Sequence, residues 1–435
     1  MPIPTAPPSG FRDFLPEQVA LRQTAMAAIT KVYKSFGFQP IQTSAVEDLA
    51  VLTGQGGGEN EKLIFKIMKR GEALERAQAE KADLADLGLR FDLTLPLARY
   101  YTKHGSLLPH PFKALQMGPV WRAERAQKGR YREFTQCDVD IIGSDSWGAE
   151  VEVITAILTV FSTLGLTGVK VHLNDRALVQ HLLSFAAVPS EQHAQVCIEL
   201  DKLDKIGVDG VRTELTALIG EAKAKSIEDI FIVNAAHVAA NEEKSAALTR
   251  RLELISHSVK TAFPNAEIVS DRTLMRGMGY YTGPVFEFRH ASLSGSLGGG
   301  GRYDKLTEKF GGQPIPACGG SIGFERLMII LEEMGKHAAS AAPDAVVTVF
   351  SDELRGRSLD VAAALRAKGL SVDVFPGGGK LKGQFKYADQ KKAAYALVIG
   401  PDEAERGVVQ VKSLKTGNEQ AVTLDEACAL IAAGV

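Results

Sequence analysis

Apolar residues recur with a helical spacing in two parts of the chain. The first predicted helix begins at Pro16, because proline is favoured in the first helical turn. Its apolar stripe, spaced by three and four residues, consists of Met26, Ile29, Tyr33 and Phe36. A second stripe predicts a helix over residues 149–164 that ends at Gly165. Each helix is expected to bury its apolar face.

Other segments have the pattern of strands. Residues 38–41 follow the first helix, and residues 169–173 follow the second. The segment LRFDLTLPLARY (Leu89–Tyr100) alternates as far as Thr94, and Pro96 then predicts a turn. Residues 70–88 are charged and rich in alanine, so we expect an exposed helical insertion there.

The same patterns divide the chain into regions. Residues 174–260 are polar and helical in pattern, which predicts an inserted helical domain. The flanking segments, 1–173 and 261–332, are expected to share one sheet as a single core domain. A linker of small residues follows over 333–343. Residues 344–435 alternate strand and helix, which predicts a small α/β domain with a largely parallel sheet.

Composition narrows the class of protein. Hydrophobic residues make up 45% and charged residues 23% of the 435 residues, which is typical of a globular protein. With a formal net charge of −2, any contact with nucleic acid must come from local basic patches. The four cysteines are scattered without a CxxC motif, so neither a zinc knuckle nor a disulfide framework is indicated. Since no apolar stretch approaches about 18 residues, we expect a cytoplasmic location and no membrane partner.

The run Gly118–Gly143 is the strongest candidate for a binding site. Two strand-like ends flank a loop that contains one acid, Glu124, and the cations Arg122, Arg125, Lys128, Arg130 and Arg132. The planar fork of arginine binds phosphate oxygens in pairs, so this hairpin suits ATP or a nucleic acid. Phe134, Gln136 and Asp140 alternate along the outgoing strand and are expected to share one face with Arg132. The alternative is a solvated basic turn.

Two glycine-rich segments are further candidates. In Leu274–Phe288, Arg276 precedes glycines and the pair Tyr280 and Tyr281. An arginine that is buried in this segment needs a bound anion or a carboxylate partner, because an unpaired buried charge is unfavourable. In Leu297–Leu306, consecutive glycines either bind a phosphate or let two backbones pack closely.

Two more segments carry positive charge. In Ile315–Leu331, small residues lead to a helix that begins near Gly323, with Arg326 in its first turn, which is an arrangement suited to an anion. Residues 380–392 contain five lysines with Phe385 and Tyr387 interleaved, which suits unstacked RNA bases or, alternatively, a solvated helix face. No HExxH, GxSxG or GxxxxGK[ST] motif occurs and the histidines do not cluster, so no protein-built metal site is predicted.

Together these segments resemble the class II aminoacyl-tRNA synthetases, and specifically the histidyl-tRNA synthetase family. WRAERAQKGRYREFTQ resembles motif 2, RGMGYYTGPVFE the histidine-specific signature, and GGSIGFERL motif 3. GFRDFLP, LRFDLTLPLARY, LNDR and GGRYDKL also match, as does the tail LKGQFKYADQKKAAYALVIG. Ser44, Ala126 and Gly279 depart from the family pattern.

The resemblance implies an α+β class II catalytic core, in which helices flank a six-stranded antiparallel sheet. It also implies a helical insertion domain, a C-terminal α/β anticodon-binding domain and a homodimer formed near Phe36–Asp48. The implied reaction joins L-histidine to ATP with release of pyrophosphate and then transfers histidine to the 3′ end of tRNA(His). Mg²⁺ is expected to arrive bound to ATP.

The family pattern also implies roles for the residues that would bind ATP. Arg122 and Arg276 would hold the α-phosphate from two sides and are the expected catalytic residues. Arg326 would bind the γ-phosphate. Glu124 would meet the adenine amino group, and Phe134 would stack on the ring.

Histidine and tRNA are assigned to other residues on the same pattern. The implied histidine pocket consists of Asp92, Thr94, Gln136, Asp140, Tyr280, Tyr281 and Tyr303. The first three would contact the α-amino group, and Asp140 and Tyr281 would pair with the two imidazole nitrogens. The implied tRNA contacts are Arg125, Gln127, Lys380, Lys382 and Lys386.

Three other functions compete with this interpretation. The main one is a histidine-sensing regulatory paralogue that binds a biosynthetic enzyme and charges no tRNA. That class generally loses the catalytic arginines and the C-terminal domain, and both are retained here. The others are a class II synthetase for a different amino acid and a purely RNA-binding module.

Overall fold

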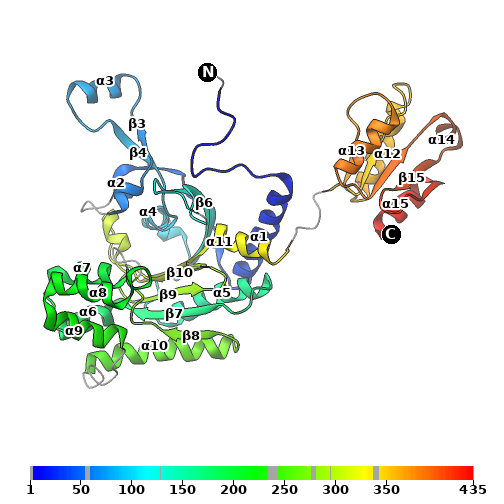
Figure 1. Cartoon of the computed structure of the whole chain (residues 1–435). Coiled ribbons are helices and arrows are strands. Elements are labelled where there is room, and N and C mark those ends of the chain that lie inside the picture. The colour runs from blue at the N-terminus through cyan, green and yellow to red at the C-terminus, as the bar shows by residue number, and fades with distance from the viewer. Residues whose placement is uncertain are drawn as a thin grey trace. The chain divides into compact units, whose positions relative to one another are not determined.

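The computed structural model describes residues 3–53, 59–127, 129–233, 243–275, 281–293, 295–336 and 342–434. The chain divides near Lys336 into two compact units, the first coloured blue to yellow and the second orange to red in Figure 1. Each unit has its own sheet and its own core.

An eight-stranded sheet is the centre of the first unit. In spatial order its strands are β1 (Gln39–Pro40), β5 (Phe112–Trp121), β6 (Glu133–Ile142), β11 (Ala317–Gly323), β10 (Gly298–Arg302), β9 (Pro284–Arg289), β7 (Lys170–Asp175) and β8 (Glu267–Ser270). The strands from β5 to β7 are antiparallel throughout, whereas β1 and β8 pair in parallel at the two edges. The antiparallel sheet expected from the sequence is therefore confirmed, with two parallel edge strands added.

Helices cover one face of this sheet. They are α1 (Pro16–Ser35), α5 (Gly148–Thr163) and α11 (Phe324–Glu333). The predicted starts of α1 and α5 are confirmed, and Ile29 and Tyr33 of the predicted stripe are fully buried. Val153 and Ile157 of α5 lie directly against the backbone at Gly320, which leaves no room for a side chain on that strand.

Residues 66–104 differ from the prediction. The expected strand and turn after Leu89 form a helix, α4 (Thr94–His104), with Pro96 in its first turn, where the missing N–H of proline costs no hydrogen bond. The expected insertion at 70–88 is helical only in α3 (Glu72–Ala79). The flanking strands β3 (Lys66–Met68) and β4 (Ala85–Leu89) form a small sheet with β2 (Val46–Asp48), and α2 (Leu49–Thr53) follows β2. Alanine and charge patterns report helix propensity but not strand pairing.

The predicted helical region contains helices throughout its described part. They are α6 (Arg176–Phe185), α7 (His193–Leu200), α8 (Leu203–Ile219), α9 (Glu221–Ile227) and α10 (Glu243–Ala262). Asp175 caps α6, since its carboxylate accepts a bond of 2.8 Å from the N–H of Ala177. Figure 1 shows these helices gathered beside β7 and β8.

The second unit has a five-stranded sheet in the order β13 (Val372–Val374), β12 (Ala345–Val347), β14 (Tyr395–Val398), β15 (Val409–Ser413) and β16 (Glu419–Val422). Its helices are α12 (Arg355–Ala367), α13 (Leu381–Gln390), α14 (Pro401–Arg406) and α15 (Leu424–Ala433). The prediction of a largely parallel sheet is wrong for half of the pairings, because β14, β15 and β16 are antiparallel. A short turn joins β15 to β16, and a short turn permits only an antiparallel pair.

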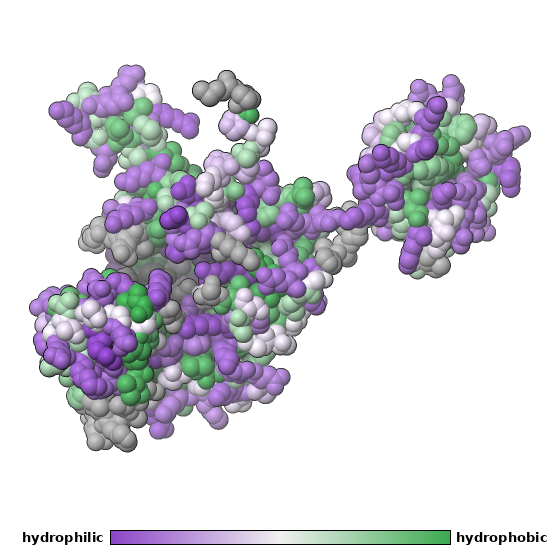
Figure 2. Space-filling model, in the orientation of Figure 1, coloured by the Kyte–Doolittle hydropathy of each residue, from purple (hydrophilic) through white to green (hydrophobic). Residues whose placement is uncertain are grey.

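The exposed surface is mainly hydrophilic on the face that Figure 2 shows, with isolated hydrophobic side chains among the polar ones. Across the described ranges, no helix is both long and apolar enough to cross a membrane.

Candidate active site

A cavity of about 870 Å³ lies in the first unit against the face of the large sheet opposite to α5. Its walls come from segments that are far apart in the sequence. The predicted ligand-binding residues that line it are Asp92, Thr94, Arg122, Glu124, Phe134, Gln136, Asp140, Tyr281, Tyr303 and Arg326. The structure therefore brings together residues from five separate motifs. Arg276 and Tyr280 lie outside the described residues.

The alternation of strand β6 produces one wall of the cavity. Phe134, Gln136, Asp138 and Asp140 all line it, while the intervening residues are buried on the helix-covered face. The sequence interpretation omitted Asp138, although the same period-two rule places it between two predicted residues. Arg132 does not join this wall, because its guanidinium bonds the backbone oxygens of Glu124 and Ser9 instead.

Asp140 is the most deeply enclosed predicted residue. Asp140 is 2% exposed, and the hydroxyl of Tyr303 donates a hydrogen bond to its Oδ1. Its Oδ2 has no hydrogen-bond partner among the described residues. Burial raises the pKa of Asp140 to about 7, against the hydrogen bond from Tyr303, which lowers it. Gly319 faces this carboxylate, and a Cβ there would overlap Oδ1.

Two more buried acids lie at this end of the cavity. Burial raises the pKa of Asp92, and burial followed by the charge of Asp140 raises the pKa of Asp138 well above its usual value. The amide of Gln136 donates to Ser321 Oγ at 3.2 Å, and its Oε1 lacks a partner in the described part of the chain. Closely spaced carboxylates and an unused amide oxygen make this end of the cavity suited to a ligand with a positive charge and N–H donors.

The other end of the cavity carries arginines. Arg122 Nε donates to the carbonyl of Phe91 at 3.0 Å, and its guanidinium lies 4.9 Å from the centre of the Phe134 ring. These two contacts hold Arg122 beside the aromatic face. Glu124, which also lines this end, forms an ion pair with Arg130.

Arg326 reaches the same cavity from the first turn of α11. Its Nη1 donates to the carbonyl of Ser296 at 2.6 Å, which ties the helix start to the segment before β10. Arg122 and Arg326 are separated by about two hundred residues, and the fold places both in one cavity. Both arginines that the family pattern assigns to phosphate binding therefore line one cavity.

An ion-pair cluster in the wall of the cavity, which Glu325 lines, was missed by the sequence interpretation. Glu325 accepts hydrogen bonds from Arg12 and Arg22, and it also accepts one of 3.3 Å from the backbone N–H of Thr135. Burial alone would raise the pKa of Glu325, but the two arginines lower it. The Arg12 guanidinium lies 3.3 Å from the centre of the Tyr131 ring. The cluster fixes α11 against β6, and its sequence signals were the motifs GFRDFLP and GGSIGFERL, which contain Arg12 and Glu325.

The glycines of β10 mainly allow close packing of strands. A Cβ at Gly300 would overlap the carbonyl of Gly319 on the neighbouring strand, so no other residue fits there. Gly298 and Gly299 also line the cavity. Asp201 and Lys205 from the helical region line it as well, and the sequence offered no signal for that.

The predicted tRNA contacts are exposed. Arg125 and Gln127 lie in the turn between β5 and β6, where backbone bonds of 2.9 Å join Gln127 and Arg130. In the second unit Lys380, Lys382 and Lys386 are exposed at α13. The interleaved rings have another role there, because Phe385 and Tyr387 pack against a buried cluster and the hydroxyl of Tyr387 donates to Asp373 at 2.7 Å.

Metal-ligating side chains do not cluster in the described part of the chain. No group of three or more His, Cys, Asp or Glu residues is placed there to hold an ion.

Comparison with known proteins agrees with the geometry. Residues 10–327 match the family described as histidyl-tRNA synthetase, and residues 344–433 match an anticodon binding domain. A histidine–tRNA ligase of Leifsonia xyli is 39% identical over 92% of this chain and 99% of its own length. One from Cytophaga hutchinsonii is 35% identical over 96% of this chain and 97% of its own length.

A solved structure extends the agreement to the fold. The crystal structure of histidyl-tRNA synthetase from Nostoc sp. PCC 7120 superposes with a TM-score of 0.82 at 28% identity, covering 100% of both chains. The order of the motifs, the two units and the shared cavity are thus features of one family. The chain belongs to the histidyl-tRNA synthetase family.

Proposed function

We propose that this chain is a histidine–tRNA ligase. It activates L-histidine with ATP, releases pyrophosphate and transfers histidine to the 3′ end of tRNA(His). The observation that carries the proposal is a single cavity with an Asp140–Tyr303 pair at one end and Arg122 and Arg326 at the other. Histidine and a triphosphate need these two opposite environments side by side.

Histidine is recognised at the acidic end. Asp140 accepts a hydrogen bond from one imidazole nitrogen through its unused Oδ2, and the hydroxyl of Tyr281 meets the other. The α-ammonium group lies among Asp92, Thr94 and Gln136. Tyr280 and Tyr303 complete the pocket. A site built from such hydrogen bonds rejects an analogue that lacks them by about 10⁴-fold, because its buried polar groups lose their partners.

Activation takes place between the two ends. A carboxylate oxygen of histidine attacks the α-phosphorus of ATP, the bond to the β-phosphate bridging oxygen breaks, and pyrophosphate leaves. Negative charge builds up at the α-phosphate, so catalysis rests on placement and on cations. Arg122 and Arg276 stabilise that charge, and Arg326 holds the γ-phosphate. Phe134 stacks on adenine, and Glu124 accepts from its amino group after release from Arg130.

The remaining partners follow from the exposed residues. Mg²⁺ enters with ATP and neutralises the triphosphate. Arg125 and Gln127 contact the acceptor end of tRNA(His), and Lys380, Lys382 and Lys386 contact the anticodon arm electrostatically. The active form is a homodimer joined through residues 36–48, and it works in the cytoplasm.

ATP–pyrophosphate exchange tests the proposal. Exchange that depends on histidine, among all amino acids, supports it, and charging of tRNA(His) completes it. Exchange driven by another amino acid would assign a different synthetase. Histidine binding without exchange or charging would favour the regulatory paralogue. Replacing all three exposed lysines by alanine should raise the KM for tRNA and leave exchange unchanged.

A further inference from the structure

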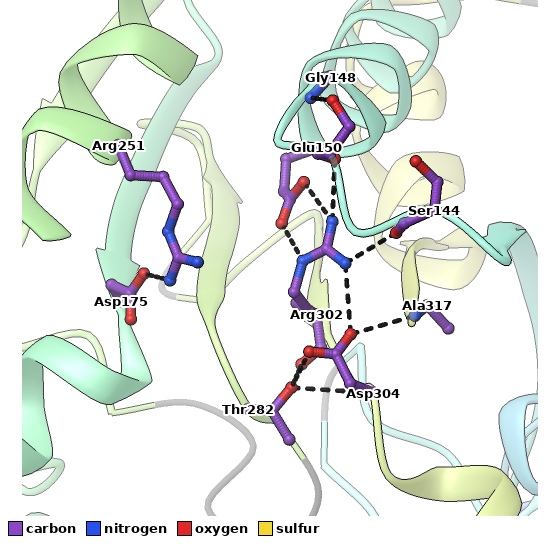
Figure 3. Close-up of polar contacts among 10 residues, drawn as sticks. Ser144, Gly148, Glu150, Asp175, Arg251, Thr282, Arg302, Asp304 and Ala317 are labelled. Carbon is purple, nitrogen blue, oxygen red and sulfur yellow. Dashed lines mark hydrogen bonds and ion pairs between the residues drawn. The ribbon is translucent and has the colours of Figure 1, made fainter. Parts of the chain in front are cut away.

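A network of polar contacts, buried at Arg302 and Glu150 and partly exposed at Thr282 and Asp304, adjoins the tyrosines of the cavity (Figure 3). Its centre is Arg302, which is 4% exposed, and Glu150 on α5 is fully buried. The guanidinium donates from Nε and Nη2 to the two carboxylate oxygens of Glu150 at 2.7 and 2.8 Å. Burial acts to lower the pKa of Arg302, but this paired contact raises it, so the arginine stays charged.

The rest of the guanidinium is also used. Nη1 donates to the carbonyl of Ser144 at 2.9 Å and to Asp304 Oδ1 at 3.3 Å, and Nη2 donates to the carbonyl of Ser146 at 3.1 Å. Arg302 thereby joins the end of β10 to the start of α5 through several bonds at once.

Asp304 and Thr282 extend the network to the chain that enters β9. Asp304 Oδ1 accepts from the N–H of Ala317 at 3.2 Å. The hydroxyl of Thr282 donates to Asp304 Oδ2 and accepts from the N–H of Asp304, both at 3.1 Å. The N–H of Thr282 donates to the carbonyl of Arg302 at 2.7 Å. Thr282 and Asp304 are thus locked to each other by backbone and side chain together.

Each locked residue is the neighbour of a tyrosine at the cavity. Tyr303 lies between Arg302 and Asp304, and its hydroxyl reaches Asp140. Tyr281 precedes Thr282 and lines the same cavity. Tyr303 directly follows strand β10, in which successive side chains point to opposite sides, so anchoring Arg302 behind the wall sets Tyr303 in front of it. Thr282 and Asp304 fix the backbone immediately after each tyrosine.

We propose that the Glu150–Arg302–Asp304–Thr282 network positions Tyr281 and Tyr303 for histidine. Its members are positioning residues, since they act through the two tyrosines. The choice of histidine as ligand rests on the function proposed above. A paired arginine–carboxylate contact contributes little net stability compared with an apolar packing of the same volume, but it defines direction sharply. That property suits a support for hydrogen-bonding groups.

Thr282 offers the mildest test, because valine has nearly the shape of threonine without the hydroxyl. Thr282→Val should weaken histidine binding by about tenfold, because the tyrosine hydroxyls are no longer held in position. Calorimetry on the full chain measures this affinity. The KM for ATP in the exchange reaction should change less than twofold. Thr282→Ser, which keeps the hydroxyl, should bind histidine like the unsubstituted protein.

Thr348→Val is the matched control. Thr348 is fully buried in the second unit, and its hydroxyl donates to the carbonyl of Leu397 at 2.9 Å. This variant loses a buried threonine hydroxyl bond away from the network, so histidine binding should not change. If Thr282→Val does not fold, Asp304→Asn serves instead, with the same expected selective loss.

The outcomes separate the two proposals. Three results would each overturn the positioning role. The first is unchanged histidine affinity in Thr282→Val, and the second is an equal loss of affinity for histidine and for ATP. The third is a Thr282→Ser variant that binds histidine as weakly as Thr282→Val. Because calorimetry measures binding without turnover, it reports on the network even when exchange is absent. Absence of exchange in the unsubstituted protein would instead overturn the proposed function.

Discussion

Two buried carboxylates in the first unit have opposite surroundings. Glu150 is 0% exposed and receives two hydrogen bonds from Arg302. Asp140 is 2% exposed, receives one from the neutral hydroxyl of Tyr303, and keeps Oδ2 without a partner among the described residues. The negative charge of Glu150 is compensated within the protein by Arg302. That of Asp140 needs compensation by a proton or by a ligand.

This difference in charge compensation distinguishes a carboxylate that supports the fold from one that is available to bind a ligand. A buried ion pair that is complete holds its elements in one geometry, and breaking it is costly. A buried acid without a cation makes the empty protein less stable, but the energy is recovered when a donor binds. The same contrast holds for Glu325, which has Arg12 and Arg22, against Asp138, whose acidic neighbour Asp140 disfavours its charge.

The largest expected effect is on Glu150. Glu150→Gln removes the fully buried, paired counter-charge of Arg302 and leaves it only the partly exposed Asp304 at 3.3 Å, so the free energy of unfolding should fall by about 3 kcal/mol. Urea unfolding of both proteins measures the loss. A loss below about 1 kcal/mol would show that Arg302 is not compensated by Glu150.

Asp140 should respond in the opposite way. Asp140→Asn removes an uncompensated acid, so the fold should be as stable as before at about pH 5 and more stable at higher pH, where Asp140 becomes ionised. Histidine binding should weaken by about a hundredfold, the value of a charged hydrogen bond, because the imidazole N–H loses its carboxylate. ATP binding should be nearly unchanged. Equal losses for histidine and ATP, measured by exchange kinetics, would mean that the imidazole site lies elsewhere.

The pH dependence of stability sharpens the contrast further. The pKa of Asp140 is raised from 3.8 to about 7, so between these values the folded state binds more protons than the unfolded state. The contribution of Asp140 to stability must therefore fall as pH rises through this window, by about 1.4 kcal/mol per unit. Between pH 5 and 6.5, the unsubstituted protein should lose about 2 kcal/mol relative to Asp140→Asn. A constant difference between the two unfolding curves would contradict the raised pKa.

The smallest expected loss of stability is for a substitution of Asp175. Its fully buried carboxylate caps α6 and pairs with Arg251 on α10, whose side chain is 32% exposed (Figure 3). Asp175→Asn keeps an oxygen for the cap, and Arg251 can be hydrated, so the loss should be only about 1 kcal/mol by thermal unfolding. If Asp175→Asn lost as much stability as Glu150→Gln, the solvent exposure of the arginine partner would not determine how much stability is lost when its carboxylate is removed.

Much of the site was readable from residue types and spacing. Arg122 and Arg326 were predicted as anion ligands, and Phe134, Gln136 and Asp140 as one strand face, because charge and period-two alternation are local properties. Asp138 obeys the same alternation and was overlooked. Arg132 obeys it too but turns away, since the N-terminal segment at Ser9 offers it carbonyl oxygens.

The failures have a common cause. Leu89–Thr94 alternates like a strand yet forms none beyond Leu89, a helix begins at Thr94 where Pro96 predicted a turn, and β16 had no distinct pattern. Short segments satisfy more than one period, so their neighbours in space select the conformation. Glu150 likewise appeared as one polar residue on an apolar helix, and only its contact with Arg302 explains why it is buried.

By itself, the sequence determined the order of the motifs, the helical and strand-rich regions and the chemical types available for binding, because these depend on residues close together in the chain. Tertiary structure alone decided which acids received a cation. Arg302 reaches Glu150 across 152 positions, whereas among the described residues Asp140 receives its one side-chain hydrogen bond from a tyrosine. Compensation of buried charge depends on distances of a few ångströms between remote segments, and no local pattern encodes such distances.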